Sequence, residues 1–307
     1  MPQIVISREY DPMGVRLAVR SRSIRMVEAI ESGLARYPDM GVRGELSMHV
    51  DVHDDLAGDP GWPNVEYLDE PAELVVRIGS STATLTFATG QVQVHLSRSL
   101  CDVPDALRLL AESVFTAAAE RTGELRAVHS ALVVHDGVGL MLRGASGAGK
   151  STLAYGCLRN GWSVCSADWV YASAHRPAGR FAGYPWRLMM PADAAARFLE
   201  TTTVQAVPHP TEEGERVPVH PPAAQQLLEA DVNAVVLLDP SPVLAVHAIG
   251  AREAIDRFWA PALPTEHEHL AEEWVAELLA RPVFVLQRGN DPMAAVQRLT
   301  ELAASLR

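Results

Sequence analysis

One short stretch near the middle of the chain combines the residue types and the spacing of a phosphate-binding loop. It matches the pattern G-x-x-x-x-G-K-[ST] and, with one following residue, reads Gly144, Ala145, Ser146, Gly147, Ala148, Gly149, Lys150, Ser151 and Thr152. The glycines allow the backbone to turn so that successive N–H groups point inward at phosphate oxygens. Lys150 supplies a positive charge for the β- and γ-phosphates, and the Ser151 hydroxyl is a ligand for Mg²⁺. The stretch therefore predicts a nucleotide site.

The residues on either side of this loop have the patterns of a strand and a helix. The apolar run 138–142 predicts a buried strand, which forms a hairpin with 128–134 through Asp136 and Gly137. Ser151 opens a helix that we expect to end near Asn160 and Gly161. The N-terminal end of a helix favours an anion. A plain glycine-rich turn is the alternative, and the flanking elements favour phosphate binding over it.

Two aspartates compete for the role of the acid beside the phosphates. Asp168 follows the expected strand 163–166, the first strand after the loop helix, where a carboxylate would reach both the metal and the attacking hydroxyl. Asp239 follows the apolar run 235–238, which has the form of a Walker B strand. Because Pro240 comes next, a strand-end turn also explains Asp239. We therefore rank Asp168 first, as the catalytic aspartate and metal ligand, and Asp239 second.

Two further side chains are candidates for the catalytic site. His129 on the strand before the loop could orient the acceptor or stabilise transferred charge, although a lone histidine on a strand is more often a core residue. Arg187 could clamp a phosphate with its bidentate fork, and a surface arginine beside Trp186 is the alternative. Two clusters only superficially suggest metal sites, and we expect both to be solvated loops: Asp51, His53, Asp54 and Asp55, and His267, Glu268 and His269.

Composition narrows the class of protein. A chain of 307 residues with 48% hydrophobic residues can build a large core or two ordinary ones. The net charge of −12 argues against a nucleic-acid partner, because phosphate neutralisation needs clustered lysine and arginine. Cys101, Cys157 and Cys165 form no C-x-x-C pair and are expected to be free thiols in a reducing compartment.

The sequence shows no targeting or membrane signal. The first residues lack a basic region followed by an apolar core, so we expect no signal peptide. No uncharged apolar stretch approaches the length that crosses a bilayer, so we expect no membrane partner and a cytoplasmic protein. A homo-oligomer is compatible with these patterns.

The pattern of strands and helices predicts two parts. Residues 1–125 read as a mixed, strand-rich α/β module that recognises substrate or completes the fold. We expect strands at 3–7, 44–52, 74–78, 83–87 and 91–96, helices at 23–37 and 105–122, and a loop at 56–72. Residues 126–307 carry the phosphate loop. There we expect further strands at 233–238 and 283–286, helices at 251–258 and 292–306, and a long loop at 202–222, either a lid or an insertion.

From Val128 to Ala172 the chain resembles the HPr serine kinase/phosphorylase family, and weaker similarity extends through Arg187 and 282–286. The resemblance rests on 129–133, 137–139, the phosphate loop, 160–162 and 166–168, and it is to the divergent HPr-kinase-like branch. It implies an α/β fold with a mixed sheet, a PEP-carboxykinase-like P-loop core, in 126–307. Ala167 stands where the family often has a second acid, and Ser130 replaces a glycine. The glycine-rich signature of the reverse, phosphorolytic reaction is not recognisable.

The resemblance implies an ATP- and Mg²⁺-dependent kinase that phosphorylates a hydroxyl, with Lys150, Asp168, His129 and Arg187 in the catalytic roles. The acceptor would be a peptide or protein serine or threonine, or a small metabolite, and the divergent branch suggests a tailoring enzyme. The alternative is a nucleotide-dependent ATPase or switch that binds a partner without phosphorylating it. A PEP-carboxykinase-like lyase would need a second metal with histidine and lysine ligands, which the sequence does not supply.

Overall fold

The computed structural model describes residues 5–40, 45–53, 64–121, 125–174, 178–198, 209–211 and 214–307. The chain divides into two compact units. The N-terminal unit comprises Met1–Leu125 with Pro210–Gly214, and the C-terminal unit comprises Arg126–His209 with Glu215–Arg307.

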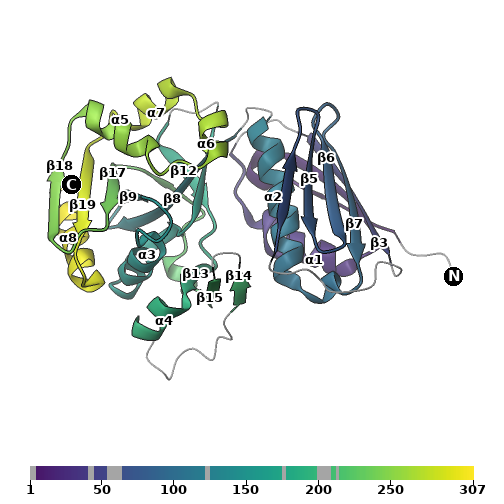
Figure 1. Cartoon of the computed structure of the whole chain (residues 1–307), viewed down its shortest axis with the longest axis horizontal. Helices are drawn as coiled ribbons and strands as arrows, with labels where there is room; N and C mark the ends of the chain where they lie inside the picture. Colours follow the sequence, from purple (N-terminus) through teal and green to yellow (C-terminus); the bar gives the residue numbers. More distant parts are fainter. Residues whose placement is uncertain are drawn as a thin grey trace. The chain divides into compact units, whose positions relative to one another are not determined.

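The N-terminal unit is a seven-stranded sheet covered by two helices (Figure 1). The strands, in their order across the sheet, are β1 (Ile6–Tyr10), β2 (Arg16–Ser21), β3 (Glu45–His53), β7 (Gln91–Ser97), β6 (Ser81–Thr86), β5 (Glu73–Ile78) and β4 (Glu66–Asp69). The strands β2, β3 and β7 are parallel, and the other pairs are antiparallel. The helices α1 (Ile24–Ser32) and α2 (Pro104–Arg121) pack on each other, and α2 packs on β5 and β6. Three single 3₁₀ turns complete the unit: Pro12–Gly14, Leu34–Arg36 and Leu100–Asp102.

Alternating burial along these strands explains how the sheet forms. In β5 and β7 every second residue is buried, because successive side chains of a strand point to opposite faces. The alternation at 74–96 predicts an antiparallel meander, and the structure confirms it in β5, β6 and β7. The predicted loop at 56–72 is wrong for Glu66–Asp69, which pairs with β5 through its backbone although all four side chains are exposed. Strand β2 was not predicted.

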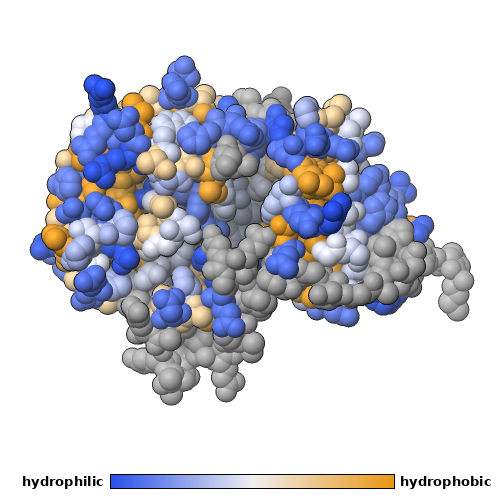
Figure 2. Space-filling view, in the orientation of Figure 1, coloured by the Kyte–Doolittle hydropathy of each residue, from blue (hydrophilic) through white to orange (hydrophobic). Residues whose placement is uncertain are grey.

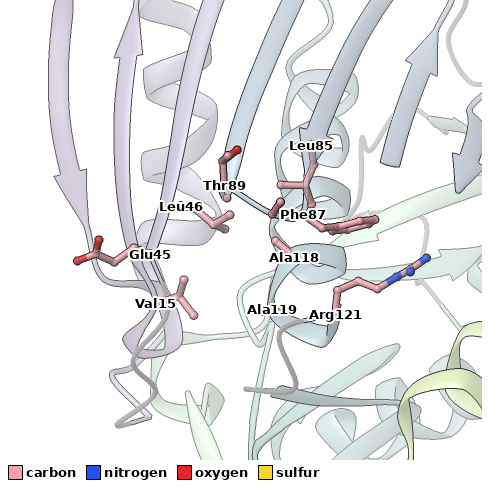
Figure 3. A pocket seen from close by; sticks show the side chains of 11 residues that line it. Val15, Glu45, Leu46, Leu85, Phe87, Thr89, Ala118, Ala119 and Arg121 are labelled. Carbon is pink, nitrogen blue, oxygen red and sulfur yellow. The ribbon is translucent and has the colours of Figure 1, made fainter. Parts of the chain in front are cut away.

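A cavity of about 270 Å³ lies inside the N-terminal unit (Figure 3). Apolar side chains such as Leu46, Leu85 and Phe87 line it, together with the charged residues Glu45 and Arg121. The Arg121 guanidinium lies 4.6 Å from the centre of the Phe87 ring, a cation–π contact. No residue of the phosphate loop lines this cavity.

The C-terminal unit is built on a mixed nine-stranded sheet. The strands run in the order β16 (Glu229–Asp231), β12 (Arg180–Gly183), β11 (Trp169–Ser173), β8 (Leu125–His135), β9 (Val138–Arg143), β17 (Ala234–Asp239), β19 (Val283–Arg288) and β18 (Leu244–Ala248), with β10 (Ser163–Ser166) pairing with β8. Strands β9, β17 and β19 are parallel, whereas β8 is antiparallel to β9 and β10, and β18 is antiparallel to β19. The prediction of a mixed α/β fold is confirmed.

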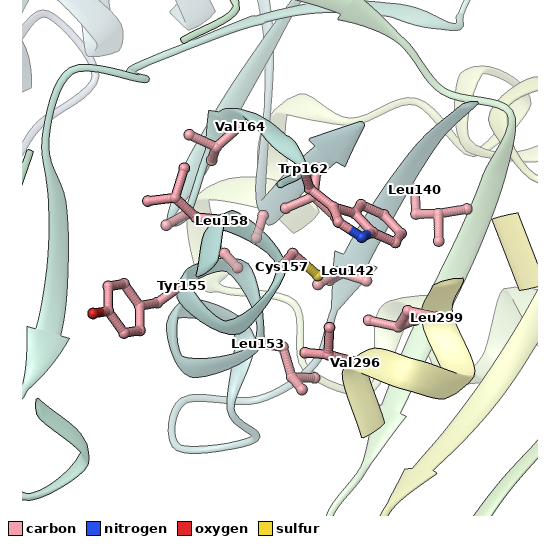
Figure 4. Close-up of a cluster of buried hydrophobic side chains, with 14 of the residues drawn as sticks. Leu140, Leu142, Leu153, Tyr155, Cys157, Leu158, Trp162, Val164, Val296 and Leu299 are labelled. Atoms are coloured by element: carbon pink, nitrogen blue, oxygen red, sulfur yellow. The ribbon is translucent and has the colours of Figure 1, made fainter. Parts of the chain in front are cut away.

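Helices cover both faces of this sheet. On one face α3 (Lys150–Arg159) and α8 (Pro292–Ser305) pack on each other and on β9 and β17, and Figure 4 shows Leu142, Cys157 and Leu299 converging there. On the other face α5 (Ala251–Trp259) and α7 (Glu272–Leu278) contribute Phe258, Val275 and Leu278 to a second apolar cluster. Alternate residues of β17 enter the two clusters, as the period of two requires. The remaining elements are α6 (Pro264–His269), the 3₁₀ turn Ala223–Gln225 and three elements beyond β12: β13 (Leu188–Pro191), α4 (Ala192–Phe198) and β15 (Gly214–Val219).

The structure confirms some local predictions in this unit and corrects others. The turn of the β8–β9 hairpin lies at Asp136 and Gly137, where both residues have positive φ, 47° and 84°. The predicted loop at 202–222 is wrong for β15, which pairs antiparallel with β13, and the short strand β14 (His209–Thr211) also falls in that range. Residues 202–208 and 212–213 of the predicted loop lie outside the described residues.

The surface of each unit is mostly hydrophilic on the face that Figure 2 displays, with scattered apolar side chains. Among the described residues no helix is long and apolar enough to pass through a lipid bilayer.

Candidate functional site

The predicted phosphate loop lies between the end of β9 and the start of α3. Strand β9 ends at Arg143, and α3 begins at Lys150. Gly147 and Gly149 have φ values of 78° and 101°, a backbone conformation that residues other than glycine adopt only with strain. A hydrogen bond from the Ala148 N–H to the Ala145 carbonyl (3.0 Å) closes the turn. The loop therefore makes a tight turn between β9 and α3, and Ser151 and Thr152 follow in the first turn of the helix.

The Lys150 side chain folds back into the loop. Its Nζ atom donates hydrogen bonds to the carbonyls of Gly144 (2.8 Å) and Ala145 (3.3 Å), and the residue is buried. Lys150 is also the only lysine in the sequence, so all the other 25 of the 26 basic residues are arginines. A compact ammonium and a planar guanidinium are not interchangeable at a phosphate. Lysine therefore occurs only at the position where the G-x-x-x-x-G-K-[ST] pattern has it, and every other basic residue is an arginine.

The sheet register brings His129 and Asp168 together. Ser130 pairs with Arg143, so His129 lies at the same end of the sheet as the start of the loop. Ser166 of β10 pairs with Leu132, which carries Asp168 back along β8 towards His129. The result is a contact of 3.1 Å between His129 Nε2 and Asp168 Oδ1. The His129 ring also stacks on Trp169, with ring centres 5.1 Å apart, so its orientation is held from two sides.

The acid lies next to the hydroxyl of the loop. Ser151 Oγ donates a hydrogen bond to the carbonyl of Ala167 (3.3 Å), the residue directly before Asp168. The Asp168 side chain is 72% exposed, whereas that of His129 is only 14% exposed. The carboxylate is therefore open to a ligand while its histidine partner is held in the protein. A hydroxyl and a carboxylate are hard oxygen ligands of the kind that Mg²⁺ prefers, so Ser151 and Asp168 fit this ion.

Positive charge surrounds the Asp168 carboxylate. Desolvation acts to raise the pKa of Asp168, but the hydrogen bond from His129 and the charges of His129, Lys150 and Arg216 lower it and prevail. The pKa of Asp168 therefore lies below its ordinary value, and the group stays ionised at neutral pH. Arg216 lies on β15, opposite Pro191 in the register with β13. Since the carboxylate is exposed, water screens these charges in part.

A buried ion pair supports the base of the loop. Arg143 Nη1 donates to Glu266 Oε1 (2.7 Å), and both side chains are 1% exposed. The Glu266 carboxylate also accepts hydrogen bonds from the backbone N–H groups of His129 (3.0 Å) and Leu263 (2.9 Å). Arg143 Nε donates to the Phe258 carbonyl (2.8 Å), and its guanidinium lies 3.9 Å from the centre of the Phe258 ring. One carboxylate thus joins the strand before the loop to the strand that carries His129.

Desolvation of Glu266 acts to raise its pKa, but the charge and hydrogen bonds of Arg143 and the two backbone N–H groups outweigh it and lower the pKa. A carboxylate with a lowered folded-state pKa stabilises the fold above its unfolded-state pKa. That contribution is lost as the pH falls through the folded-state pKa.

The other predicted residues take the following places. Asp239 is the last residue of β17, the parallel neighbour of β9, so it lies at the sheet edge from which the loop emerges. Arg187 is half-buried and directly precedes β13. Ser146 is exposed within the loop. The functional roles of these residues, like those of the other predicted site residues, remain predictions.

The two apparent metal clusters gain no support. His267, Glu268 and His269 lie in the helix α6 rather than in the predicted loop, because Pro264 starts a helical turn there. Asp51 and His53 belong to β3, and Asp54 and Asp55 lie outside the described residues. Among the residues that the structure describes, no group of three or more histidine, cysteine, aspartate or glutamate residues could hold a metal ion.

The three cysteines are free, as predicted, and all three are buried. Burial raises the pKa of Cys157 and of Cys165, so neither thiol is suited to act as a nucleophile.

Sequence reasoning missed four residues that lie near the loop or act on its neighbours: Arg143, Arg216, Glu266 and Arg288. Arg216 fell within the predicted loop, although the alternation of Arg216, Val217, Pro218 and Val219 was a weak strand signal. Arg143 and Glu266 are 123 positions apart and carry no common motif. Arg288 ends the last strand, and its Cδ atom would lie 3.4 Å from a Cβ atom built on Gly149.

Comparisons with known proteins add little. No family model matches the sequence, and no curated protein matches it. Among solved structures, the chain is similar to the HPr(Ser) kinase/phosphatase from Coxiella burnetii, with 13% sequence identity and a TM-score of 0.32. The match covers 59% of this chain and 98% of that chain. A likeness at this level carries no functional argument, so the resemblance to the HPr-kinase-like family remains a prediction.

The buried pair predicts a large effect of Glu266→Gln on stability. The substitution leaves the Arg143 charge uncompensated in the interior, so we expect the free energy of unfolding at neutral pH to fall by about 3–5 kcal/mol. Chemical denaturation at a series of pH values measures the free energy of unfolding. The difference in this free energy between the variant and the unsubstituted protein should become smaller as the pH falls through the folded-state pKa of Glu266. Glu253→Gln, which breaks the exposed pair with Arg257, is the control and should cost at most about 0.5 kcal/mol. Equal effects of the two substitutions would refute the role of the buried pair.

The His129–Asp168 contact predicts a change in the titration of the acid. His129→Phe keeps a ring against Trp169 but removes the hydrogen bond and the charge, so the pKa of Asp168 should rise towards its ordinary value. Carbon-detected NMR of the aspartate carboxyl groups follows this directly. The control is His135→Phe. The His135 ring stacks on Trp162 and not on Trp169, so this substitution should leave the Asp168 titration unchanged. The assignment fails if His129→Phe leaves it unchanged as well.

Proposed function

We propose that this protein is an ATP- and Mg²⁺-dependent kinase that transfers the γ-phosphate to a hydroxyl group. One observation carries the proposal: an exposed carboxylate, Asp168, is held by His129 at 3.1 Å and directly follows the residue whose carbonyl accepts the Ser151 hydrogen bond. Phosphoryl transfer needs a phosphate cradle, a metal ligand and a group that accepts the proton of the attacking hydroxyl. In this proposal the loop is the phosphate cradle, Ser151 and Asp168 are the metal ligands, and Asp168 also accepts the proton.

Each group has a role in this proposal. The loop N–H groups and Lys150 would bind the phosphates, and the ammonium would exchange its loop carbonyls for phosphate oxygens. Ser151 and Asp168 would hold Mg²⁺, which supplies charge neutralisation at the phosphates when bound. Asp168 would accept the proton of the acceptor hydroxyl, with His129 keeping the carboxylate oriented and ionised. Arg187 would clamp a phosphate. Such catalysis depends mostly on positioning and charge, so few residues suffice.

The acceptor is proposed as a hydroxyl on a serine or threonine of a peptide or protein, or on a small metabolite. The 72% exposure of Asp168 supports an acceptor that approaches from solvent, because a bulky substrate can then reach the carboxylate. The N-terminal unit is proposed to contribute to substrate recognition. We also propose a cytoplasmic location and no nucleic-acid partner, in keeping with the net charge of −12.

A second candidate is a P-loop ATPase that binds a partner and transfers phosphate only to water. The observation that favours it is the position of Asp239 at the end of β17, next to and parallel with β9. This is where an acid would take the metal in a standard ATPase of this class. In that case Asp239 rather than Asp168 would be indispensable.

The kinase proposal predicts that Lys150 is essential for turnover. Lys150→Ala removes a preorganised charge from the transition state and should lower the rate of phosphoryl transfer by about 10²–10³-fold. Lys150→Arg keeps the charge but not the compact shape, so it should recover only part of the rate. Mass spectrometry of candidate acceptors after incubation with MgATP measures transfer. Because the chain has one lysine, an amine-reactive ATP analogue should label Lys150 and at most the N-terminus, and excess MgATP should block the Lys150 label. Undiminished turnover in Lys150→Ala would exclude the loop from catalysis.

The two candidate functions predict opposite effects at the two acids. Asp168→Asn keeps the shape of the side chain but removes its charge, so Mg²⁺-dependent transfer should collapse while the fold is retained. Asp239→Asn is the matched control and should lower this transfer much less. Parallel assays of acceptor phosphorylation and phosphate release separate the alternatives. Loss of activity in Asp239→Asn with activity retained in Asp168→Asn would identify the protein as an ATPase and overturn the kinase proposal.

A further inference from the structure

An arginine at the end of the last strand lies close to the phosphate loop. Leu237 of β17 pairs with Arg143 on one side and with Val285 of β19 on the other, so these two residues lie level in the sheet. Arg288 is three residues beyond Val285, which at about 3.3 Å per residue places its backbone about 10 Å further along the strand direction. Because β9, β17 and β19 are parallel, that direction is the one in which the loop leaves β9. Arg288 therefore emerges at the same edge of the sheet as the loop.

The Arg288 side chain runs across Gly149, the residue before Lys150. A Cβ atom on Gly149 would lie 3.4 Å from Arg288 Cδ, 3.5 Å from Nε and 3.9 Å from Cζ, so both the stem and the guanidinium lie against the loop backbone. These distances are ordinary van der Waals contacts, so Arg288 is a direct neighbour of this part of the loop. The guanidinium thus lies beside the residues that are expected to bind phosphate.

This guanidinium has no acceptor in the described part of the chain. The Nε atom is buried without a hydrogen-bond partner, and no described residue forms an ion pair with Arg288. Four other arginines of the same unit have a carboxylate partner: Arg143 has Glu266, Arg180 has Glu229, Arg257 has Glu253 and Arg298 has Glu301. The contrast is informative because the chain has 38 acidic and only 26 basic residues, so acids are plentiful. A buried donor without an acceptor is unfavourable unless a ligand supplies one.

We propose that Arg288 is a phosphate-binding residue of the loop, with a phosphate oxygen of the nucleotide as the missing acceptor. The planar fork can donate two parallel hydrogen bonds to a phosphate, whereas Lys150 acts as a point charge. The Lys150 ammonium and the Arg288 guanidinium, which lies beside Gly149, would then both bind the phosphates. This inference rests on the proposed nucleotide site, but it requires only that a polyphosphate binds there and not that it is transferred.

The test is the binding of ATP and of inorganic tripolyphosphate, measured by isothermal titration calorimetry with Mg²⁺ present. Arg288→Met keeps an apolar stem against Gly149 but removes the fork and the charge. It should weaken the binding of both ligands by about 10- to 100-fold. Arg288→Lys retains the charge without the fork and should fall between Arg288→Met and the unsubstituted protein. Arg298→Met, which breaks an exposed pair on α8, is the matched control and should bind both ligands normally.

A structural role would give a different result. Because Arg288 has no partner in the described residues, Arg288→Met should leave the midpoint of thermal unfolding unchanged or raise it. A lowered midpoint would assign Arg288 to the fold and overturn the proposal. Weaker binding of ATP with unchanged binding of tripolyphosphate would assign the guanidinium to the nucleoside and overturn it too, as would unchanged binding of both.

The outcome also separates this inference from the kinase proposal. If the unsubstituted protein binds polyphosphate and Arg288→Met binds it more weakly, the inference stands even where no acceptor is phosphorylated, and only the kinase proposal falls. If the unsubstituted protein binds neither ligand, the inference is overturned together with the nucleotide site.

Discussion

The buried pair of Arg143 and Glu266 is the interaction on which the geometry of the site depends. Arg143 is the last residue before the phosphate loop, and Glu266 also accepts the backbone N–H of His129. Two charges are tolerated at 1% exposure because each has several hydrogen-bond partners. The pair is not a large net source of stability, since burying charge is costly. Its effect is to hold the start of the loop and the strand of His129 in one arrangement.

Strand direction explains why the charged groups meet at one edge of the sheet. Three parallel strands end there, and they deliver the loop, Asp239 and Arg288. The antiparallel strand β8 begins at that edge and contributes His129, while β10 leads to Asp168 from the other side of β8. A wholly parallel sheet would place the start of β8 at the opposite edge. The mixed sheet is therefore what allows a histidine upstream of the loop to contact an aspartate downstream of it.

The electrostatics of the edge differ from those of the chain as a whole. The protein carries a net charge of −12, yet the charges of Lys150 and Arg216 act on the exposed carboxylate of Asp168, and Arg288 lies against the loop. A local excess of positive charge in an acidic protein attracts anions to one place. The cavity of the N-terminal unit has no comparable set of cations, since Arg121 there already contacts Asp69 and Phe87.

The sequence by itself determined the local features of this protein. The G-x-x-x-x-G-K-[ST] spacing, the alternation in β5 to β7 and the turn at Asp136 and Gly137 depend on neighbouring residues, so they could be predicted. The mixed α/β class followed from the same patterns and a family resemblance. Only the tertiary structure decided which distant residues meet. The contact of His129 with Asp168 depends on the register of β8 with β9 and β10, and the pairing of Arg143 with Glu266 joins residues 123 positions apart. Strand pairing and burial are long-range consequences of the whole core, and short sequence windows do not contain them.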